Sequence, residues 1–228
     1  MNDGTQREHR WIAIGDIHDD SMDKLAAIPE LSGADGLIIT GDLTNIGGER
    51  EAARVLGAAR RSIPVAAALF GNMDKAEVAE LLDREGINIH ASARLLAPGL
   101  AVVGVGGSTP TPFGTPREFS EADYATWLEN CRIEAKKLAD QMLLVSHNPP
   151  KNTKCDRIGA GAHVGSEAVR AFIEAHQHAL CLCGHIHEAR ATDAIGATQV
   201  INPGNFGAGG YIVLSYVQGR LAADLRIL

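Results

Sequence analysis

The chain has 228 residues, a formal net charge of −7, and 45% hydrophobic against 21% charged residues. These values are typical of a globular protein and exclude extensive disorder; we expect a single domain over residues 1–228, with residues 1–10 as a flexible N-terminal tail. The acidic charge argues against a long nucleic-acid partner, and apolar runs shorter than the roughly 20 residues of a bilayer span argue against a membrane.

The first half of the chain alternates apolar β-type runs with helix-type segments. Strands are predicted over residues 11–15, 36–40 and 64–70. Helices are predicted over residues 21–31, 49–61 and 75–85, the last of them behind an acidic cap at Asp74. This βαβαβα order favours parallel strands that are connected by helical crossovers.

The second half of the chain is richer in strands. Helices are predicted over residues 120–138 and 165–176, and strands over residues 101–105, 141–146 and 179–183. The tail from residue 199 to residue 228 is typical of two or three strands, with turns near residues 203–204 and 218–219. A total of about nine or ten strands exceeds what one open sheet needs, so the pattern favours an α/β fold with two packed sheets.

Polar side chains of the kinds that bind metals directly follow the predicted strands. Each comes at a strand end, where ligand sites of α/β sheets form, and most of them follow a glycine, which lets the backbone turn and leaves space near an ion. The set consists of Asp16, His18, Asp42, Asn72, His147, His185 and His187. Taken singly, an Asp or Asn at these places is an ordinary cap or turn residue; their shared position favours a metal site.

The chemistry of this set favours two ions. Two carboxylates, one amide and four imidazoles suit Mn, Fe, Zn or Ni better than Mg or Ca. Seven side chains are too many for one ion and sufficient for two if one carboxylate bridges them. Asp42, the middle carboxylate, is the natural bridge.

The five blocks GDIH, GDL, GN, SH and GHIH resemble those of the calcineurin-like metallophosphoesterases, over a stretch from Asp16 to about Gly204. The resemblance implies a four-layer fold, in which two mixed sheets pack face to face between flanking helices. It also implies that one ion is bound by Asp16, His18 and His187, and the other by Asn72, His147 and His185, with Asp42 between them. The loops 106–116 and 201–204 resemble those of the small Icc-related predicted phosphoesterases.

We therefore expect a metal-dependent phosphohydrolase with two divalent ions, Mn first among the candidates. Two cations about 3.5–4 Å apart can clamp a phosphoryl group and generate a bridging hydroxide that attacks phosphorus. The expected substrate is a small phosphoester, with phosphodiesters ahead of monoesters. The alternative is a protein-binding scaffold with weak catalysis, which Met73 favours because many family members have a histidine there and methionine cannot donate a proton.

His163, in a glycine-rich loop, is the candidate replacement for that proton donor, although the pattern fits an ordinary capping or loop histidine somewhat better. Lys151, Lys154 and Arg157 are candidates for contact with substrate phosphate or members of a solvated surface. The N-terminus has no signal-peptide pattern and the four cysteines form no paired framework, so we expect a cytoplasmic protein. A homo-oligomer is compatible with the composition.

Overall fold

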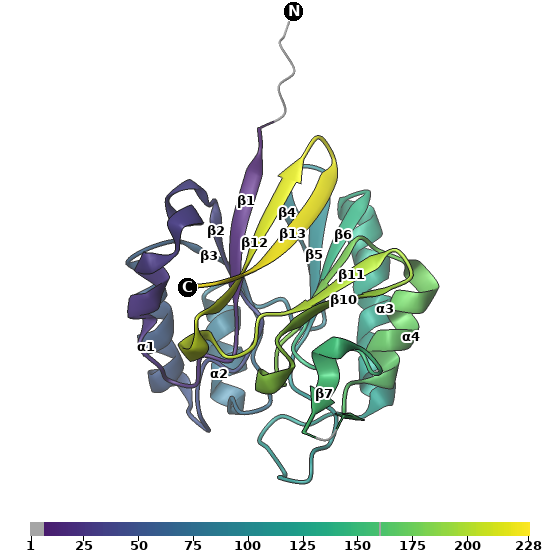
Figure 1. Ribbon diagram of the computed structural model, residues 1–228, viewed down its shortest axis with the longest axis horizontal. Coiled ribbons are helices and arrows are strands. Elements are labelled where there is room, and N and C mark those ends of the chain that lie inside the picture. Colours follow the sequence, from purple (N-terminus) through teal and green to yellow (C-terminus); the bar gives the residue numbers. More distant parts are fainter. Residues whose placement is uncertain (1–6, 160) are drawn as a thin grey trace, which may run out of the picture.

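The computed structural model describes residues 7–159 and 161–228, and it confirms the predicted four-layer α/β fold. Two large mixed sheets pack face to face, and helices cover both outer faces (Figure 1). Residues 1–6 of the predicted N-terminal tail lie outside the described residues, whereas His9 and Arg10 already belong to the first strand. Within the described ranges, none of the helices combines the length and the apolarity that a membrane span requires.

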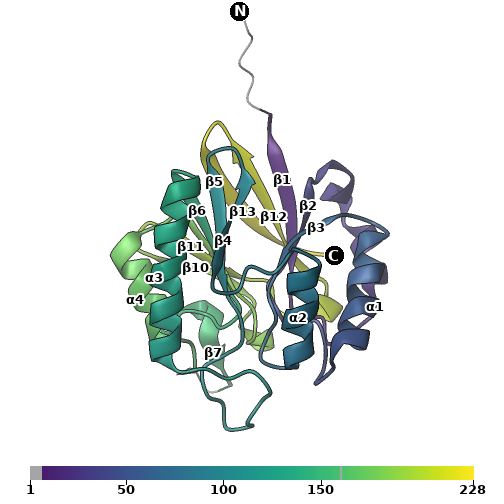
Figure 2. The ribbon, with the colours of Figure 1, turned by 180° about the vertical axis from the view of Figure 1, so that it is seen from behind.

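The first sheet has five strands in the order β13-β12-β1-β2-β3. The strands β1, β2 and β3 are parallel, as the βαβαβα pattern predicts, and the β12–β13 hairpin adds antiparallel to β1. Helices α1 and α2 cover its outer face (Figure 2). The element bounds are β1 His9–Ile14, β2 Gly36–Ile39, α1 Glu49–Arg60, β3 Val65–Ala68, α2 Ala76–Arg84, β12 Gly210–Val217 and β13 Arg220–Ile227.

The second sheet has six strands in the order β10-β11-β9-β6-β5-β4. Its inner strands β11, β9, β6 and β5 are parallel, and both edge strands are antiparallel. Helices α3 and α4 cover the face turned away from the first sheet (Figure 2). The bounds are β4 Ser92–Ala97, β5 Leu100–Val105, α3 Glu121–Leu138, β6 Gln141–Ser146, α4 Glu167–His176, β9 Leu180–Leu182, β10 Ala191–Ile195 and β11 Thr198–Asn202.

Alternation along the strands explains the layers. In β1, Ile12 and Ile14 point toward α1 and α2, whereas Trp11 and Ala13 point into the interface between the sheets. A third apolar layer lies between the second sheet and α3 and α4. Strands buried on both faces are nearly continuous apolar runs, which is why they stand out in the sequence.

The predicted helix over residues 21–31 is wrong in kind. Two short 3-10 helices occupy it, Met22–Ala27 and Pro29–Gly33. Pro29 has no N–H for a continuing helix and forces the preceding residue out of the helical region, so Ile28 has φ −68° and ψ 116°. The strands β4 and β10 and the small hairpin of β7 (Arg157–Ile158) and β8 (Ala162–His163) were not predicted.

The topology brings the carboxyl ends of the parallel strands of both sheets to one edge of the molecule. The chain after β3 and the chain after β5 are joined there by a hydrogen bond from the N–H of Gly107 to the carbonyl of Phe70 at 3.2 Å. The N–H of Gly184 donates to the carbonyl of His147 at 3.1 Å. This edge, at the bottom of Figure 1, is where the predicted ligands gather.

Candidate metal centre

One group of candidate ligands comes from the ends of β1 and β9. Asp16 is fully buried, and its Oδ1 lies 3.4 Å from Nε2 of His187. Nε2 of His18 lies 3.0 Å from Nε2 of His187. Ligand atoms of Asp16, His18 and His187 all lie within 4.8 Å of one another. These are the three residues that the resemblance groups on one ion.

A second group comes from the ends of β2, β6 and β9. Ligand atoms of Asp42, His147 and His185 also lie within 4.8 Å of one another. Nε2 of His147 lies 3.3 Å from Oδ2 of Asp42 and 3.1 Å from Oδ1 of Asn72. Asn72 therefore adjoins this group through its carbonyl oxygen, the atom that an amide offers to a metal.

Asp42 lies between the two groups. Its Oδ2 is 3.3 Å from Nε2 of His147 and 3.7 Å from Nε2 of His18. Its other oxygen, Oδ1, accepts a hydrogen bond from the N–H of Met73 at 2.8 Å. This contact fixes the carboxylate with Oδ2 turned toward both groups, as a bridging ligand requires.

The backbone at the ligands is unusual. Four of the seven have left-handed conformations: φ is 51° at Asp16, 50° at His18, 48° at Asp42 and 70° at His185. Such conformations are uncommon outside glycine and gather at functional sites, where the surrounding structure holds them in place. Here the N–H of His185 donates to both oxygens of Asp16, at 2.9 and 3.1 Å, so one ligand holds the backbone of another.

Glycines let these ligands approach one another. A Cβ on Gly71 would overlap the carboxylate of Asp42, and a Cβ on Gly41 would overlap the ring of His147. Gly41 also has φ 125°, which residues with a side chain rarely adopt. The glycines thus leave the expected space beside the candidate ligands, and the side chains of neighbouring candidate ligands occupy that space.

The local charge favours a bound cation. Burial lowers the pKa of His147, but the carboxylates of Asp42 and Asp16 outweigh it and raise that pKa to about 9. Burial and the neighbouring His147 lower the pKa of His185 to about 4, so its imidazole is neutral at pH 7 and offers a lone pair. Carboxylates that hold a proton on His147 would also hold a divalent ion, with which that proton competes.

The residues present fit a pair of divalent transition-metal ions. Each group combines an anionic oxygen with two imidazole nitrogens, which is a mixed set that Mn, Fe, Zn and Ni accept. The donors converge on two neighbouring points with one carboxylate between them.

Asp74 is an important residue that the sequence analysis misread. It was expected to cap the helix that follows, but Lys75 occupies the cap position of α2. Asp74 is fully buried instead, and its oxygens accept hydrogen bonds from the N–H groups of Gly71, Leu43 and Thr44 at 2.8, 3.1 and 2.8 Å. It thereby ties the turn before Asn72 to the turn after Asp42.

The remaining predicted residues lie in the segment between β6 and α4. Nδ1 of His163, on β8, is 2.6 Å from Oδ1 of the buried Asp156, and its side chain is 32% exposed. Neither group of clustered ligand atoms found in the described residues includes His163. The neighbouring β7 contacts the 3-10 helix His187–Ala189, so this hairpin lies beside the ligand His187.

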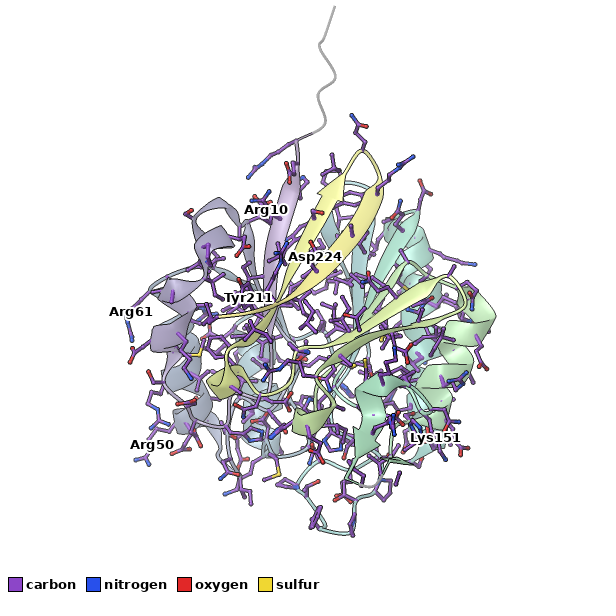
Figure 3. The ribbon with its side chains drawn as sticks, viewed as in Figure 1. Arg10, Arg50, Arg61, Lys151, Tyr211 and Asp224 are labelled. Atoms are coloured by element: carbon purple, nitrogen blue, oxygen red, sulfur yellow. The ribbon has the colours of Figure 1, made fainter. Side chains whose placement is uncertain are left out.

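The three basic candidates have different surroundings. Lys151, at the edge of the molecule in Figure 3, forms an ion pair with Glu167 at 2.6 Å. Lys154 begins the 3-10 helix Lys154–Asp156, and its backbone N–H donates to Asp193 at 2.8 Å. Arg157 is exposed on β7.

Comparisons with known proteins identify the family of the chain. The family model of the calcineurin-like phosphoesterases matches residues 9–189. An uncharacterized protein of Methanocaldococcus jannaschii is 37% identical over 174 residues, which are 75% of this chain and 77% of that protein.

Solved structures share the fold. A crystal structure of a protein from Thermus thermophilus aligns with a TM-score of 0.68 at 19% identity, over 96% of this chain and 99% of that chain. A putative 5'-nucleotidase from Staphylococcus aureus aligns with a TM-score of 0.63 at 16% identity, over 97% of this chain and 54% of the other, so this chain spans about half of it. The family match and the archaeal relative together decide the assignment: the chain belongs to the calcineurin-like phosphoesterases, a family of hydrolases that use divalent metal ions.

Proposed function

We propose that this protein hydrolyses a small phosphoester with two divalent ions at the centre described above, and that phosphodiesters are better substrates than monoesters. The observation that carries the proposal is the position of Asp42 Oδ2, which is 3.3 Å from His147 and 3.7 Å from His18, one from each side of the centre. When bound, two ions supply charge neutralisation at phosphorus and activation of a water molecule.

We assign a role to each of the residues at the centre. We assign Asp16, His18 and His187 to one ion, and Asn72, His147 and His185 to the other, with Asp42 shared. We also assign the amide of Asn72 to contact with substrate phosphate; in the structure its Nδ2 donates to Oγ1 of Thr115, in the loop after β5, at 3.0 Å. We propose Mn²⁺ as the preferred ion, with Fe, Zn and Ni as alternatives, and a small phosphorylated substrate in the cytoplasm.

His163 is the proposed proton donor to the leaving group. Its contact with the buried carboxylate of Asp156 supports this role, since a carboxylate on one ring nitrogen orients the imidazole and leaves the other nitrogen for proton transfer. The hairpin that carries it adjoins His187. We assign Arg157 and, less centrally, Lys154 and Lys151 to contact with substrate phosphate; the pairing of Lys151 with Glu167 makes it the weakest of the three.

The test of the proposed function is turnover of a chromogenic phosphodiester and the matching monoester with added Mn²⁺. Asp42→Asn should lower kcat by about a hundredfold or more, since it removes the charge that both ions share. Asp224→Asn, on β13 in the upper half of Figure 3, is the matched control and should leave kcat unchanged.

The same assay separates the enzyme from its alternative, a scaffold that binds proteins. The scaffold is favoured by Met73, whose contribution at the centre is its backbone N–H on Asp42. A protein that binds metal but turns over neither ester with Mn, Ni, Fe, Co or Zn would contradict the proposed hydrolase. For the proton donor, His163→Gln should slow esters with poor leaving groups and spare those with good ones.

A further inference from the structure

The chain between β5 and α3 forms a long loop, residues 106–119, that projects from the edge where the metal ligands gather (Figures 1 and 2). The side chain of Phe113, in the middle of this loop, is 85% exposed. A single exposed apolar residue is common on proteins. Phe113 differs from such residues because hydrogen bonds hold its loop in place and attach the loop to residues of the metal centre.

The loop is internally braced. The N–H of Ser108 donates to the carbonyl of Arg117 at 3.1 Å, and the N–H of Phe119 donates to the carbonyl of Ser108 at 2.8 Å, which closes its base. Within the loop, Oε1 of Glu118 accepts hydrogen bonds from the hydroxyls of Thr111 and Thr115, at 2.6 and 2.7 Å. The residues on both sides of Phe113 are thus fixed to one carboxylate.

The loop is also attached to the metal centre at two points. Oγ1 of Thr115 accepts from Asn72, and the N–H of Arg117 donates to the carbonyl of Asn72 at 3.1 Å. Nδ2 of Asn148, the residue after the ligand His147, donates to Oγ1 of Thr109 at 2.9 Å. Since two residues span at most about 7 Å, the Cα of Phe113 lies within that distance of the Cα of Thr115, whose hydroxyl meets Asn72.

A second exposed apolar side chain belongs to Ile46, whose backbone is hydrogen-bonded to the residue after Asn72. Ile46 is 53% exposed and has φ 60°, an outlier for a β-branched residue. Its N–H donates to the carbonyl of Met73 at 3.0 Å, and Met73 in turn holds Asp42. Hydrogen bonds, together with the peptide bond between Asn72 and Met73, therefore connect Ile46 to the loop that carries Phe113.

We propose that Phe113, with Ile46 and Met73, forms an apolar subsite that binds an aromatic ring of the phosphoester substrate beside the metal centre. This inference rests on the proposed function, because it takes the phosphate to lie at Asn72. An exposed phenyl ring on a braced loop can stack on a planar group without further loss of loop entropy. The half-buried Met73 adds a polarizable surface that suits ring edges.

The test compares two probes that share one phosphonate group and differ in its substituent. Dissociation constants of phenylphosphonate and methylphosphonate are measured by calorimetry on the Mn²⁺-loaded protein. The wild type should bind phenylphosphonate about tenfold more tightly, and Phe113→Ala should remove most of that preference. Methylphosphonate binding should stay the same, which shows that the metal centre is intact.

Two further variants complete the design. Phe113→Trp should keep the preference, and Leu95→Ala, which trims a side chain that is 55% exposed on the edge strand β4, should leave it unchanged. Equal binding of both probes by the wild type, or an unchanged ratio in Phe113→Ala, would overturn the subsite alone. A change from dimer to monomer in Phe113→Ala with an unchanged ratio would assign Phe113 to self-association instead. Failure to bind either probe, together with no turnover, would overturn the proposed function itself.

Discussion

The two carboxylate oxygens of Asp42 make different contacts. Oδ2 faces imidazoles from both ligand groups, and Oδ1 is held by the backbone of Met73. A neighbour holds the backbone as well, because the Asp74 carboxylate accepts from the N–H groups of Leu43 and Thr44, the two residues after Asp42. The left-handed conformation of Asp42 is therefore stabilised by contacts that depend on a residue far along the chain.

Asp74→Asn should weaken metal binding without removing a ligand. An amide in place of this carboxylate turns a donor toward N–H groups, so we expect about tenfold weaker Mn²⁺ binding and a loss of about 2 kcal/mol in the free energy of unfolding. Titration calorimetry with Mn²⁺ and urea unfolding measure the two effects. Asp224→Asn again serves as control, and wild-type affinity in Asp74→Asn would show that these turns hold their shape without it.

That the candidate ligands gather at one edge could be predicted from sequence, because each follows an apolar strand and strand position is a local signal. Asp74 could not, because an Asp before a helix is an ordinary cap and its true partners, Leu43 and Thr44, lie about 30 residues away. Asp156 was missed for a related reason. Its partners, among them His163 and Gly165, meet it through a small hairpin that has little sequence pattern.

At the scale of elements, the sequence located the strands that are buried on both faces and missed the half-exposed edge strands of the second sheet. Strands buried on both faces, such as β1, β2 and β5, are continuous apolar runs and were located correctly. The edge strands β4 and β10 consist mainly of half-buried and exposed residues, Leu95 among the exposed ones, so their sequences resemble loops. Pro29 marks a break that is visible in the sequence. The sequence does not show that the segments on both sides of it form 3-10 helices instead of an α-helix.

Helices α3 and α4 are joined by a cap that crosses between them. Glu121, in the first turn of α3, accepts hydrogen bonds from Oγ of Ser166 and from the N–H groups of Glu167 and Ala168, at 2.6, 2.8 and 2.9 Å. Its carboxylate therefore satisfies free donors at the start of α4, where the helix dipole also favours negative charge.

Glu121→Ala should destabilise the protein by about 1–2 kcal/mol, because it leaves these donors without their charged acceptor. Glu80→Ala, on the exposed face of α2, makes the same change in another helix and should cost little. Urea unfolding measures both variants. Equal stability of the two would mean that water replaces Glu121 at the start of α4.

At the scale of the whole molecule, the buried His178 and the half-buried His90 should limit acid stability. Burial lowers the pKa of His178 and of His90 to about 4, from the ordinary value of 6.5. A folded-state pKa below the unfolded one means that stability is complete above pH 6.5 and is lost as the pH falls toward 4. Protonation of each histidine should therefore lower the free energy of unfolding by about 2 kcal/mol between pH 7 and pH 5.

His178→Phe should reduce this loss, since a phenyl ring can occupy the apolar place beside Phe172 and binds no proton. The measurement is the free energy of unfolding in urea at pH 7 and at pH 5. The same pH dependence in His178→Phe and in the wild type would contradict the assignment.

The centre draws its candidate ligands from both sheets. The first sheet supplies the residues after β1, β2 and β3, and the second supplies those after β6 and β9, so the ligands span residues 16 to 187. Neither sheet alone contains a complete set for one ion. An ion that needs a complete set would therefore bind after the two sheets have docked, and we predict that metal uptake during refolding lags behind the burial of Trp11, which lies between them. A metal held in this way would not guide the chain to its fold, but it would slow the separation of the two sheets during unfolding.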